Sequence, residues 1–315
     1  MFDWMKKKND FPVDLVVLWC DGRDPSFSSS KNCWALKEGK ETDIANHASR
    51  FIENDELRYV FRSVEKNAHW IRYIWLVTNG QIPQWLEQTH PKIRLVTHED
   101  ILPPHALPTF NSVAIESSLH RINGLSEHFL YANDDMFVWR PIQKSLFFPR
   151  FNYVYNYYNA DYVWPTHMDM HESQVYTAYQ LVQKFFPKSK QFLTSFHNID
   201  GYLKSSFERA WQLFPTQLAD TQRHKFRQRT DVQRWIFSAV AAMQHQATWK
   251  ANIRRPLLGD IGGYYGLTEQ YEEKIAHRKP YLVCLNDHEK CSDNDRYRLR
   301  AFLKYSFPCP CSFEK

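Results

Sequence analysis

Four short apolar runs, each followed closely by polar side chains, limit this chain to a small set of folds. The runs cover residues 14–19, 72–78, 92–97 and 129–131, and the polar groups after them include Asp21, Asn79, Glu99 and Asp134. Helical patterns separate the runs, and strands that alternate with helices are typical of an α/β fold with a mainly parallel sheet. Ligands bind beyond the carboxyl ends of such strands, so the polar groups mark a candidate site.

The fourth run leads into three consecutive polar residues, Asn133, Asp134 and Asp135. Residues 136–139 are apolar again and are expected to continue the same strand, which would hold the triplet rigidly. Two adjacent carboxylates repel each other unless a positive charge lies between them. The triplet therefore favours a Mg²⁺ or Mn²⁺ site that holds substrate phosphates. An Asx-type turn between two hairpin strands is the alternative interpretation.

The first run ends in Cys20, Asp21 and Gly22, where an α/β sheet would open a ligand site. Asp21 could accept a hydrogen bond from a base or ribose, and Gly22 would allow the backbone to approach a ligand closely. An ordinary turn is the alternative, because Asp-Gly pairs are common in turns. Residues 28–54 are polar without periodicity and are predicted to form a long loop over the site.

Helices are predicted where apolar side chains recur at helical spacing. The clearest example is ELRYVFRSVEKNA, residues 56–68, and Pro83 is expected to open a short helix through residue 87. A further helix around residues 115–122 would end at Gly124. In the second half, aromatic strands are predicted within residues 147–164. Helices are predicted there around residues 172–184, 203–213 and 231–244.

Glu116 and His120 lie four residues apart in the helix predicted before the fourth strand. Side chains at this spacing share one helix face, so a carboxylate and an imidazole could point at the sheet edge together. A plain surface pair has the same spacing and is the alternative.

The composition argues against a nucleic-acid-binding, secreted or membrane-spanning protein. The 315 residues are 43% hydrophobic and 16% aromatic, which is enough for a large packed core. A formal net charge of +5, mostly scattered, is too weak to indicate nucleic-acid binding, although it is compatible with an anionic substrate or membrane surface. No signal peptide and no run of about 18 apolar residues occurs, so a soluble cytoplasmic protein is expected.

Six cysteines are expected to remain thiols, because reducing compartments disfavour structural disulfides. Four of them fall near the end of the chain, at Cys284, Cys291, Cys309 and Cys311. A zinc site is the alternative, but their spacing matches no standard zinc motif and lacks a C-x₂-C pair.

Long stretches of the sequence resemble the Stealth family of sugar-phosphate transferases. DLVVLWCDGRD, residues 14–24, is similar to the first conserved region of that family. Residues 55–138 are similar to the second region over dozens of positions in order, from ELRYVFRSVEKNAHWIRYIWLVTNGQIPQWL to EHFLYANDDMF. Residues 197–231 resemble the third region and residues 281–295 the fourth. The chain departs from the third region at Ile199 and Asp200, where the family commonly has Pro and a second His.

The resemblance implies a GT-A-like, Rossmann-like α/β fold with helices on both faces of the sheet and a C-terminal helical subdomain. A single catalytic domain is expected over residues 1–315. Residues 14–140 would bind the nucleotide-sugar, and the mostly helical residues 141–315 would complete the active site.

The implied reaction transfers a sugar 1-phosphate from a nucleotide-sugar to a hydroxyl of a glycan or capsular polysaccharide. A UDP-hexose or UDP-N-acetylhexosamine is the expected donor. The product is a phosphodiester and a nucleoside monophosphate leaves. Capsule or exopolysaccharide synthesis is the expected setting, and peripheral association with a membrane-bound export complex at the inner membrane face is left open.

Attack on the β-phosphorus needs a cation on the phosphates, donors to the equatorial oxygens and a base. Together with the resemblance, this chemistry suggests Asp135 and Asp287 as ligands of Mg²⁺ or Mn²⁺ and Arg227 as the phosphate-neutralising group. His197 is the acid-base or phosphate-binding candidate, and Asp134 is the competing base. Contacts to the nucleotide-sugar are assigned to Trp19, Asp21, Gly22, Asn133 and Glu116, the last also a candidate catalytic residue.

Two other functions remain open at this point. A metal-dependent GT-A glycosyltransferase would share the fold and release a nucleoside diphosphate. A non-catalytic sugar-binding protein would keep the pocket without turnover. The acidic triplet together with His197 and Arg227 argues against the second alternative, since a binding protein has no need of that set.

Overall fold

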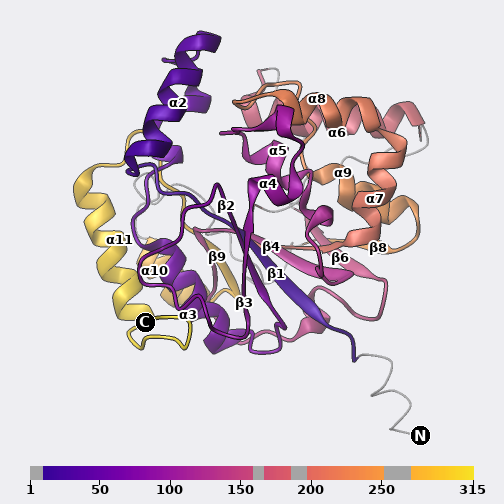
Figure 1. The fold of residues 1–315 in the computed structure, drawn as a ribbon. Coiled ribbons are helices and arrows are strands. Elements are labelled where there is room, and N and C mark those ends of the chain that lie inside the picture. Colours follow the sequence, from indigo (N-terminus) through magenta and orange to yellow (C-terminus); the bar gives the residue numbers. More distant parts are fainter. Residues whose placement is uncertain (1–9, 159–166, 186–196, 252–270) are drawn as a thin grey trace, which may run out of the picture.

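A five-stranded sheet forms the centre of the protein (Figure 1). The computed structural model describes residues 10–158, 167–185, 197–251 and 271–315. The strand order is β3-β2-β1-β4-β7, with bounds β1 (Val13–Leu18), β2 (Ile74–Thr78), β3 (Ile93–Thr97), β4 (His128–Asn133) and β7 (Asp200–Leu203). The first four strands are parallel, and β7 runs antiparallel to β4. The predicted α/β fold with a mainly parallel sheet is confirmed.

Helices cover both faces of this sheet, as predicted. Alternate residues of β1 face opposite sides, because side chains alternate along a strand. Leu15 and Val17 join the core beneath α3 (Glu56–Asn67), α10 (Tyr271–Arg278) and α11 (Asp293–Ser306). Val16 and Leu18 join the opposite core. Its helices are α4 (His98–Ile101), α5 (Ser112–Glu116), α6 (Met170–Phe185), α7 (Lys204–Leu213), α8 (Pro215–Arg223) and α9 (Trp235–Met243).

Four further strands lie outside the main sheet. β5 (Met136–Val138) pairs antiparallel with β9 (Leu282–Cys284), and β6 (Val154–Tyr158) pairs parallel with β8 (Ala247–Ala251). Residues 136–138 therefore do not continue β4, and the prediction of one continuous strand is wrong. The alternative of a hairpin is also wrong, because β4 and β5 belong to different sheets. The acidic triplet lies where the chain leaves the main sheet.

The predicted loop over residues 28–54 is wrong in its first part, which forms α2 (Pro25–Glu38). The carboxylate of Asp24 accepts a hydrogen bond from the Phe27 amide at 2.8 Å and caps this helix. Only Phe27 and Ala35 of α2 are buried, so the helix has no apolar stripe that a periodicity argument could detect. In Figure 1, α2 projects from the body of the protein.

Other helix predictions divide into confirmed and wrong ones. α3, α6, α7 and α9 confirm the predictions for residues 56–68, 172–184, 203–213 and 231–244. No helix forms over residues 83–87, where Leu86 instead makes an isolated β-bridge to Glu314. Of the aromatic strands predicted in residues 147–164, β6 is present, and residues 159–164 lie outside the described residues.

The helix predicted around residues 115–122 is broken into two pieces. α5 ends at Glu116, and a separate 3₁₀ turn covers Leu119–Arg121. The hydroxyls of Ser117 and Ser118 both donate to the carbonyl of Ala114, at 2.7 and 3.3 Å. Such local side-chain bonds compete with helix continuation and often bend a helix.

None of the helices within the described ranges combines the length and apolar content that crossing a bilayer requires.

Candidate active site

The acidic part of the site lies at the carboxyl end of β4. Asn133 is the last residue of that strand, and Asp134 and Asp135 form the turn that leads to β5. Leu18 at the end of β1 lies beside Asn133 in the parallel register, so the residues after both strands meet at one sheet edge. Asp134 and Asp135 are partly exposed to solvent and are therefore open to a ligand.

Negative charge is concentrated at this turn. Burial raises the pKa of Asp134 most. The negative charges of the Asp135, Glu56 and Glu53 carboxylates raise it further. Burial also raises the pKa of Asp135, to about 6. Partial exposure of both side chains weakens the effect of burial, but the repulsion between adjacent carboxylates remains. A proton or a cation would relieve this repulsion.

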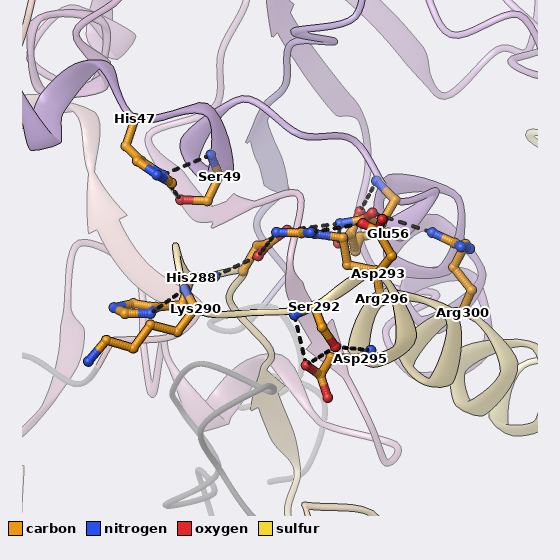
Figure 2. Close-up of polar contacts among 12 residues, drawn as sticks. His47, Ser49, Glu56, His288, Lys290, Ser292, Asp293, Asp295, Arg296 and Arg300 are labelled. Carbon is orange, nitrogen blue, oxygen red and sulfur yellow. Dashed lines mark hydrogen bonds and ion pairs between the residues drawn. The ribbon is translucent and has the colours of Figure 1, made fainter. Parts of the chain in front are cut away.

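Asp287, the second predicted metal ligand, belongs to a network between α3 and α11. Its two carboxylate oxygens accept hydrogen bonds from Arg296 at 2.8 and 3.0 Å. Asn54 donates to Glu56 at 3.0 Å and approaches Asp287 at 3.4 Å. Arg300 of α11 reaches the same network from the other side and approaches the Asn54 side-chain oxygen at 3.4 Å (Figure 2). The Asp287 carboxylate also accepts a hydrogen bond from the His288 amide at 2.6 Å, and its assignment as a metal ligand stays a prediction.

A basic group lies close to the acidic one. It consists of His171 on α6, His197, Arg227 and Arg234, which lie within electrostatic range of one another. The rings of His171 and His197 are 6.1 Å apart at an angle of 71°. Both imidazoles are exposed to solvent, so water limits how far burial can lower their pKa values. Burial and the positive charges of His171, Arg234 and Arg227 lower the pKa of His197.

Arg234 anchors this group from inside the protein. Its guanidinium forms ion pairs with Glu116 at 3.1 Å and with Asp200 at 3.4 Å. It also donates to the Tyr202 hydroxyl at 3.1 Å and lies 4.7 Å from the centre of the Tyr131 ring. Glu116, Asp200 and Arg234 are all buried. The three charged groups compensate one another, which is the usual condition for burying charge.

The end of β9 bridges the acidic and basic groups. The Cys284 thiol donates to the Asn286 side-chain oxygen at 2.9 Å and lies 3.8 Å from a carboxylate oxygen of Asp135. The Asn286 amide nitrogen then lies 3.2 Å from Nε2 of His197. The structure therefore brings Asp134, Asp135 and His197, predicted separately from the sequence, into one polar cluster.

Glu116 and His120 do not act as a pair. Glu116 binds Arg234, whereas His120 lies beyond the break after α5 and packs about 6.0 Å from the rings of Phe207 and Trp211. Both predicted alternatives for the pair are wrong, because Glu116 is neither on the surface nor aligned with His120. The nearest charged partner of Glu116 is the buried guanidinium of Arg234, and the assignment of Glu116 as a nucleotide-sugar contact stays a prediction.

The three residues assigned to the nucleotide lie at the end of β1. Trp19 is buried, and its indole N–H has no hydrogen-bond partner within the described residues. The carboxylate of Asp21 accepts hydrogen bonds from Arg23 at 2.9 and 3.1 Å. A Cβ atom on Gly22 would lie 2.5 Å from the carbonyl oxygen of Phe51. Glycine is needed at this position because a side chain would collide with the Phe51 backbone, which packs against Gly22.

The sequence missed several members of this site. Nothing in the sequence singled out His171, Arg234, Glu53 or Glu56 as site residues, although Glu56 lies in the stretch that resembles the second Stealth region. They come from three separate parts of the chain, and Arg234 is 118 positions from its partner Glu116.

Two predicted residues are held by hydroxyl groups. Asn133 has its side-chain oxygen fixed by the Tyr131 hydroxyl, which donates to it at 2.7 Å. Arg227 donates to the Ser112 hydroxyl at 2.5 Å. Both side chains are thereby oriented before any ligand binds.

Comparisons with known proteins decide the family. The model of Stealth protein CR2, conserved region 2, matches residues 50–156. The capsular polysaccharide phosphotransferase WcwK of Streptococcus pneumoniae is 30% identical over 96% of this chain and 99% of its own length. The chain belongs to the Stealth family. This Stealth chain is also 34% identical, over 97% of its length, to the exopolysaccharide phosphotransferase SCO6023 of Streptomyces coelicolor, of which it spans about half (53%).

Solved structures give a weaker likeness for this Stealth chain. An active-site mutant of LgtC matches with a TM-score of 0.44 at 12% identity, covering 95% of this chain and 98% of that protein. This score is too low to support an argument about the site. The match to the second Stealth region does include β4 and the acidic triplet.

The structure shows the surroundings of Asp200, a residue at which this chain departs from the Stealth pattern. Asp200 stands where the family commonly has a second histidine, and its carboxylate pairs with Arg234 at 3.4 Å. This Stealth chain thus has a buried ion pair at that position. The imidazole beside His197 comes instead from His171, whose ring lies 6.1 Å away.

Proposed function

We propose that the protein transfers a sugar 1-phosphate from a nucleotide-sugar to a hydroxyl of a glycan acceptor and releases a nucleoside monophosphate. One observation carries the proposal. Asp134 and Asp135 share a sheet edge with His197, and Cys284 and Asn286 bridge Asp135 to its imidazole. The relatives named above are polysaccharide phosphotransferases, and their names support the same class of reaction.

Arg227 is the group that we assign to the donor phosphates. Within the described part of the chain, only the Ser112 hydroxyl accepts a hydrogen bond from it, so its other N–H groups can donate to phosphate oxygens. Arg234 differs because Glu116, Asp200 and Tyr202 occupy its guanidinium. We therefore assign Arg234 a positioning role and Arg227 the role of stabilising charge on the transferring phosphoryl group.

Asp134 and Asp135 fit a Mg²⁺ or Mn²⁺ ion, because they are adjacent, partly exposed carboxylates that offer oxygen ligands at one turn, and the carboxylates of Asp135, Glu56 and Glu53 contribute to the raised pKa of Asp134. No three His, Cys, Asp or Glu side chains gather in a chelating group within the described ranges, so donor phosphates or water would complete the coordination. When bound, the cation would offset charge on the donor phosphates. We leave Asp287 as a secondary candidate, since using it would require its ion pair with Arg296 to open.

His197 is our candidate for accepting the proton of the attacking hydroxyl. Its lowered pKa keeps the imidazole neutral at pH 7, which is the form that accepts a proton. The Asn286 oxygen accepts from Cys284, so the Asn286 amide donates to Nε2 of His197, and this contact must open before Nε2 can accept a proton from the hydroxyl. Asp134 is the competing base. A cation beside Asp134 would lower the basicity of its carboxylate and leave the imidazole as the base.

A donor panel tests the proposal. The protein would be incubated with Mg²⁺, a glycan acceptor, and UDP-glucose, UDP-galactose or UDP-N-acetylglucosamine, and the released nucleotide identified by chromatography. We expect UMP from at least one donor. Release of UDP would indicate sugar transfer instead. Release of neither nucleotide, from protein shown to be folded, would contradict the proposal for these donors.

A further inference from the structure

A hollow of about 530 Å³ lies at the edge of the sheet opposite the candidate active site. Its lining includes Phe11 before β1, His69, Trp70 and Arg72 before β2, and Gln143 and Lys144 after β5. Its volume falls within the roughly 300–1,000 Å³ of small-ligand pockets. The six residues of β1 separate the two sheet edges by about 20 Å. One small ligand therefore cannot occupy both places.

Two large aromatic side chains line this hollow, the buried Phe11 and the partly exposed Trp70. The Trp70 indole N–H donates to the Ile142 carbonyl at 2.8 Å, which fixes the ring while it stays partly exposed. Phe151, which is 55% exposed, lies 5.9 Å from the Phe11 ring. The fixed and partly exposed Trp70 ring offers a flat apolar face at low entropic cost.

Hydrogen-bond donors stand beside these rings. Lys144 donates to the Phe11 carbonyl at 3.1 Å and its ammonium lies 4.4 Å from the centre of the Phe11 ring, so it can still donate to a ligand at the mouth of the hollow. The side chains of His69 and Gln143 are exposed and have no hydrogen-bond partner among the described residues. Arg72 is different, because Asp14 accepts two hydrogen bonds from it.

We propose that this hollow binds a sugar unit of the acceptor glycan, away from the reacting end; this inference rests on the proposed function for the nature of the acceptor. The apolar face of a pyranose would pack on Trp70, and its hydroxyls would accept from Lys144 and Gln143. A long acceptor held at two points would have a raised effective concentration at the active site.

The charge of the lining favours a glycan over an anionic membrane surface. Asp14 neutralises Arg72 through an ion pair at 2.7 Å. The lining residue Asp10 offsets the charge of Lys144. The hollow therefore carries little net positive charge with which to attract anionic lipids.

Affinity electrophoresis tests this site without any nucleotide. Native gels would contain dextran, galactan, mannan or phosphomannan, and retardation would be measured for the full chain. We expect at least one polysaccharide to retard the native protein and Trp70→Ala to weaken its binding by about threefold to tenfold. Trp70→Phe should retain most of the binding. Tyr305→Ala removes an 85% exposed aromatic residue of α11 and is the matched control that should change nothing.

Lys144→Gln and Gln143→Ala keep the inference testable if Trp70→Ala fails to fold, because each removes a donor from the hollow while Trp70 stays in place. Both should weaken binding to the same polysaccharide. Failure of all four polysaccharides to retard native protein, or equal binding by all folded variants, would overturn the inference. Failure of the proposed function is distinguishable. In that case no nucleotide-sugar is consumed with short acceptors, while polysaccharide binding still depends on Trp70.

Discussion

Arg234→Met should destabilise the protein strongly, because it leaves two buried carboxylates without their counter-ion. The Arg234 side chain is only 6% exposed, and its partners Glu116 and Asp200 are 5% and 12% exposed. Removing one member of a buried ion pair costs about 3–5 kcal/mol. Methionine retains much of the apolar stem, so a cavity should add little. We expect the free energy of unfolding in urea to fall by about 3–5 kcal/mol at pH 8.

The pH dependence of this loss identifies its cause. Burial raises the pKa of Asp200 to about 6, although Arg234 lowers it. Without Arg234, the pKa of Asp200 must rise further. A folded-state pKa above the unfolded value of about 3.9 means that stability is gained at low pH and lost as pH rises through the folded-state pKa. The difference between native and variant protein should therefore be largest above the raised pKa of Asp200 in the variant, shrink as pH falls toward about 6, and level off below it, where Asp200 is protonated in both proteins.

Two controls separate charge from packing. Asp200→Asn in the Arg234→Met background should restore part of the lost stability at pH 8, because it removes one uncompensated carboxylate. Arg298→Met breaks an exposed pair with Glu272, 3.0 Å apart, and should cost no more than about 1 kcal/mol. An equal loss for Arg234→Met at pH 5 and pH 8 would refute the assignment to buried charge.

Three further perturbations test the site. Asp135→Asn should weaken Mg²⁺ binding measured by calorimetry, and EDTA should abolish turnover of the native protein; full activity in EDTA would exclude a metal role. His197→Ala and Arg227→Ala should each lower kcat about 100-fold without loss of folding, measured by steady-state kinetics and thermal unfolding. A near-normal rate would remove that residue from the mechanism. Gly22→Ala should cost about 1–3 kcal/mol in urea unfolding, because its Cβ would meet the Phe51 carbonyl. Unchanged stability would show that this loop is free to move.

The four parallel strands of the main sheet could be predicted because they are continuous apolar runs with polar ends, whereas the antiparallel strand β7, with the sequence DGYL, was missed because it has no such run. α3 was equally clear, since its buried residues recur at helical spacing. α2 was missed because it buries only two residues, yet Asp24 followed by Pro25 is a helix-start signal that local capping rules recognise. The pattern of polar and apolar residues could not predict this helix, because a helix that projects from the body buries too few apolar side chains to show a periodic stripe.

The candidate site was predictable only where it follows strand ends or resembles known family regions. Asp134 and Asp135 follow β4, and His197 and Arg227 fall in the stretch that resembles the third Stealth region. Arg234 could not be found in this way, because its role depends on contacts with segments far away in the sequence. The ion pair of Asp287 with α11, a helix that begins at residue 293, was also not anticipated.

The bond that breaks is the most direct test of the proposed reaction. A nucleotide-sugar would carry ¹⁸O in the bridge between the β-phosphorus and sugar C1, and products would be analysed by mass spectrometry and phosphorus NMR. Attack on the β-phosphorus keeps this bridge intact, so the label should remain in a phosphodiester product while unlabelled nucleoside monophosphate leaves. Label that leaves in nucleoside diphosphate, with no phosphorus in the glycan, would contradict the account.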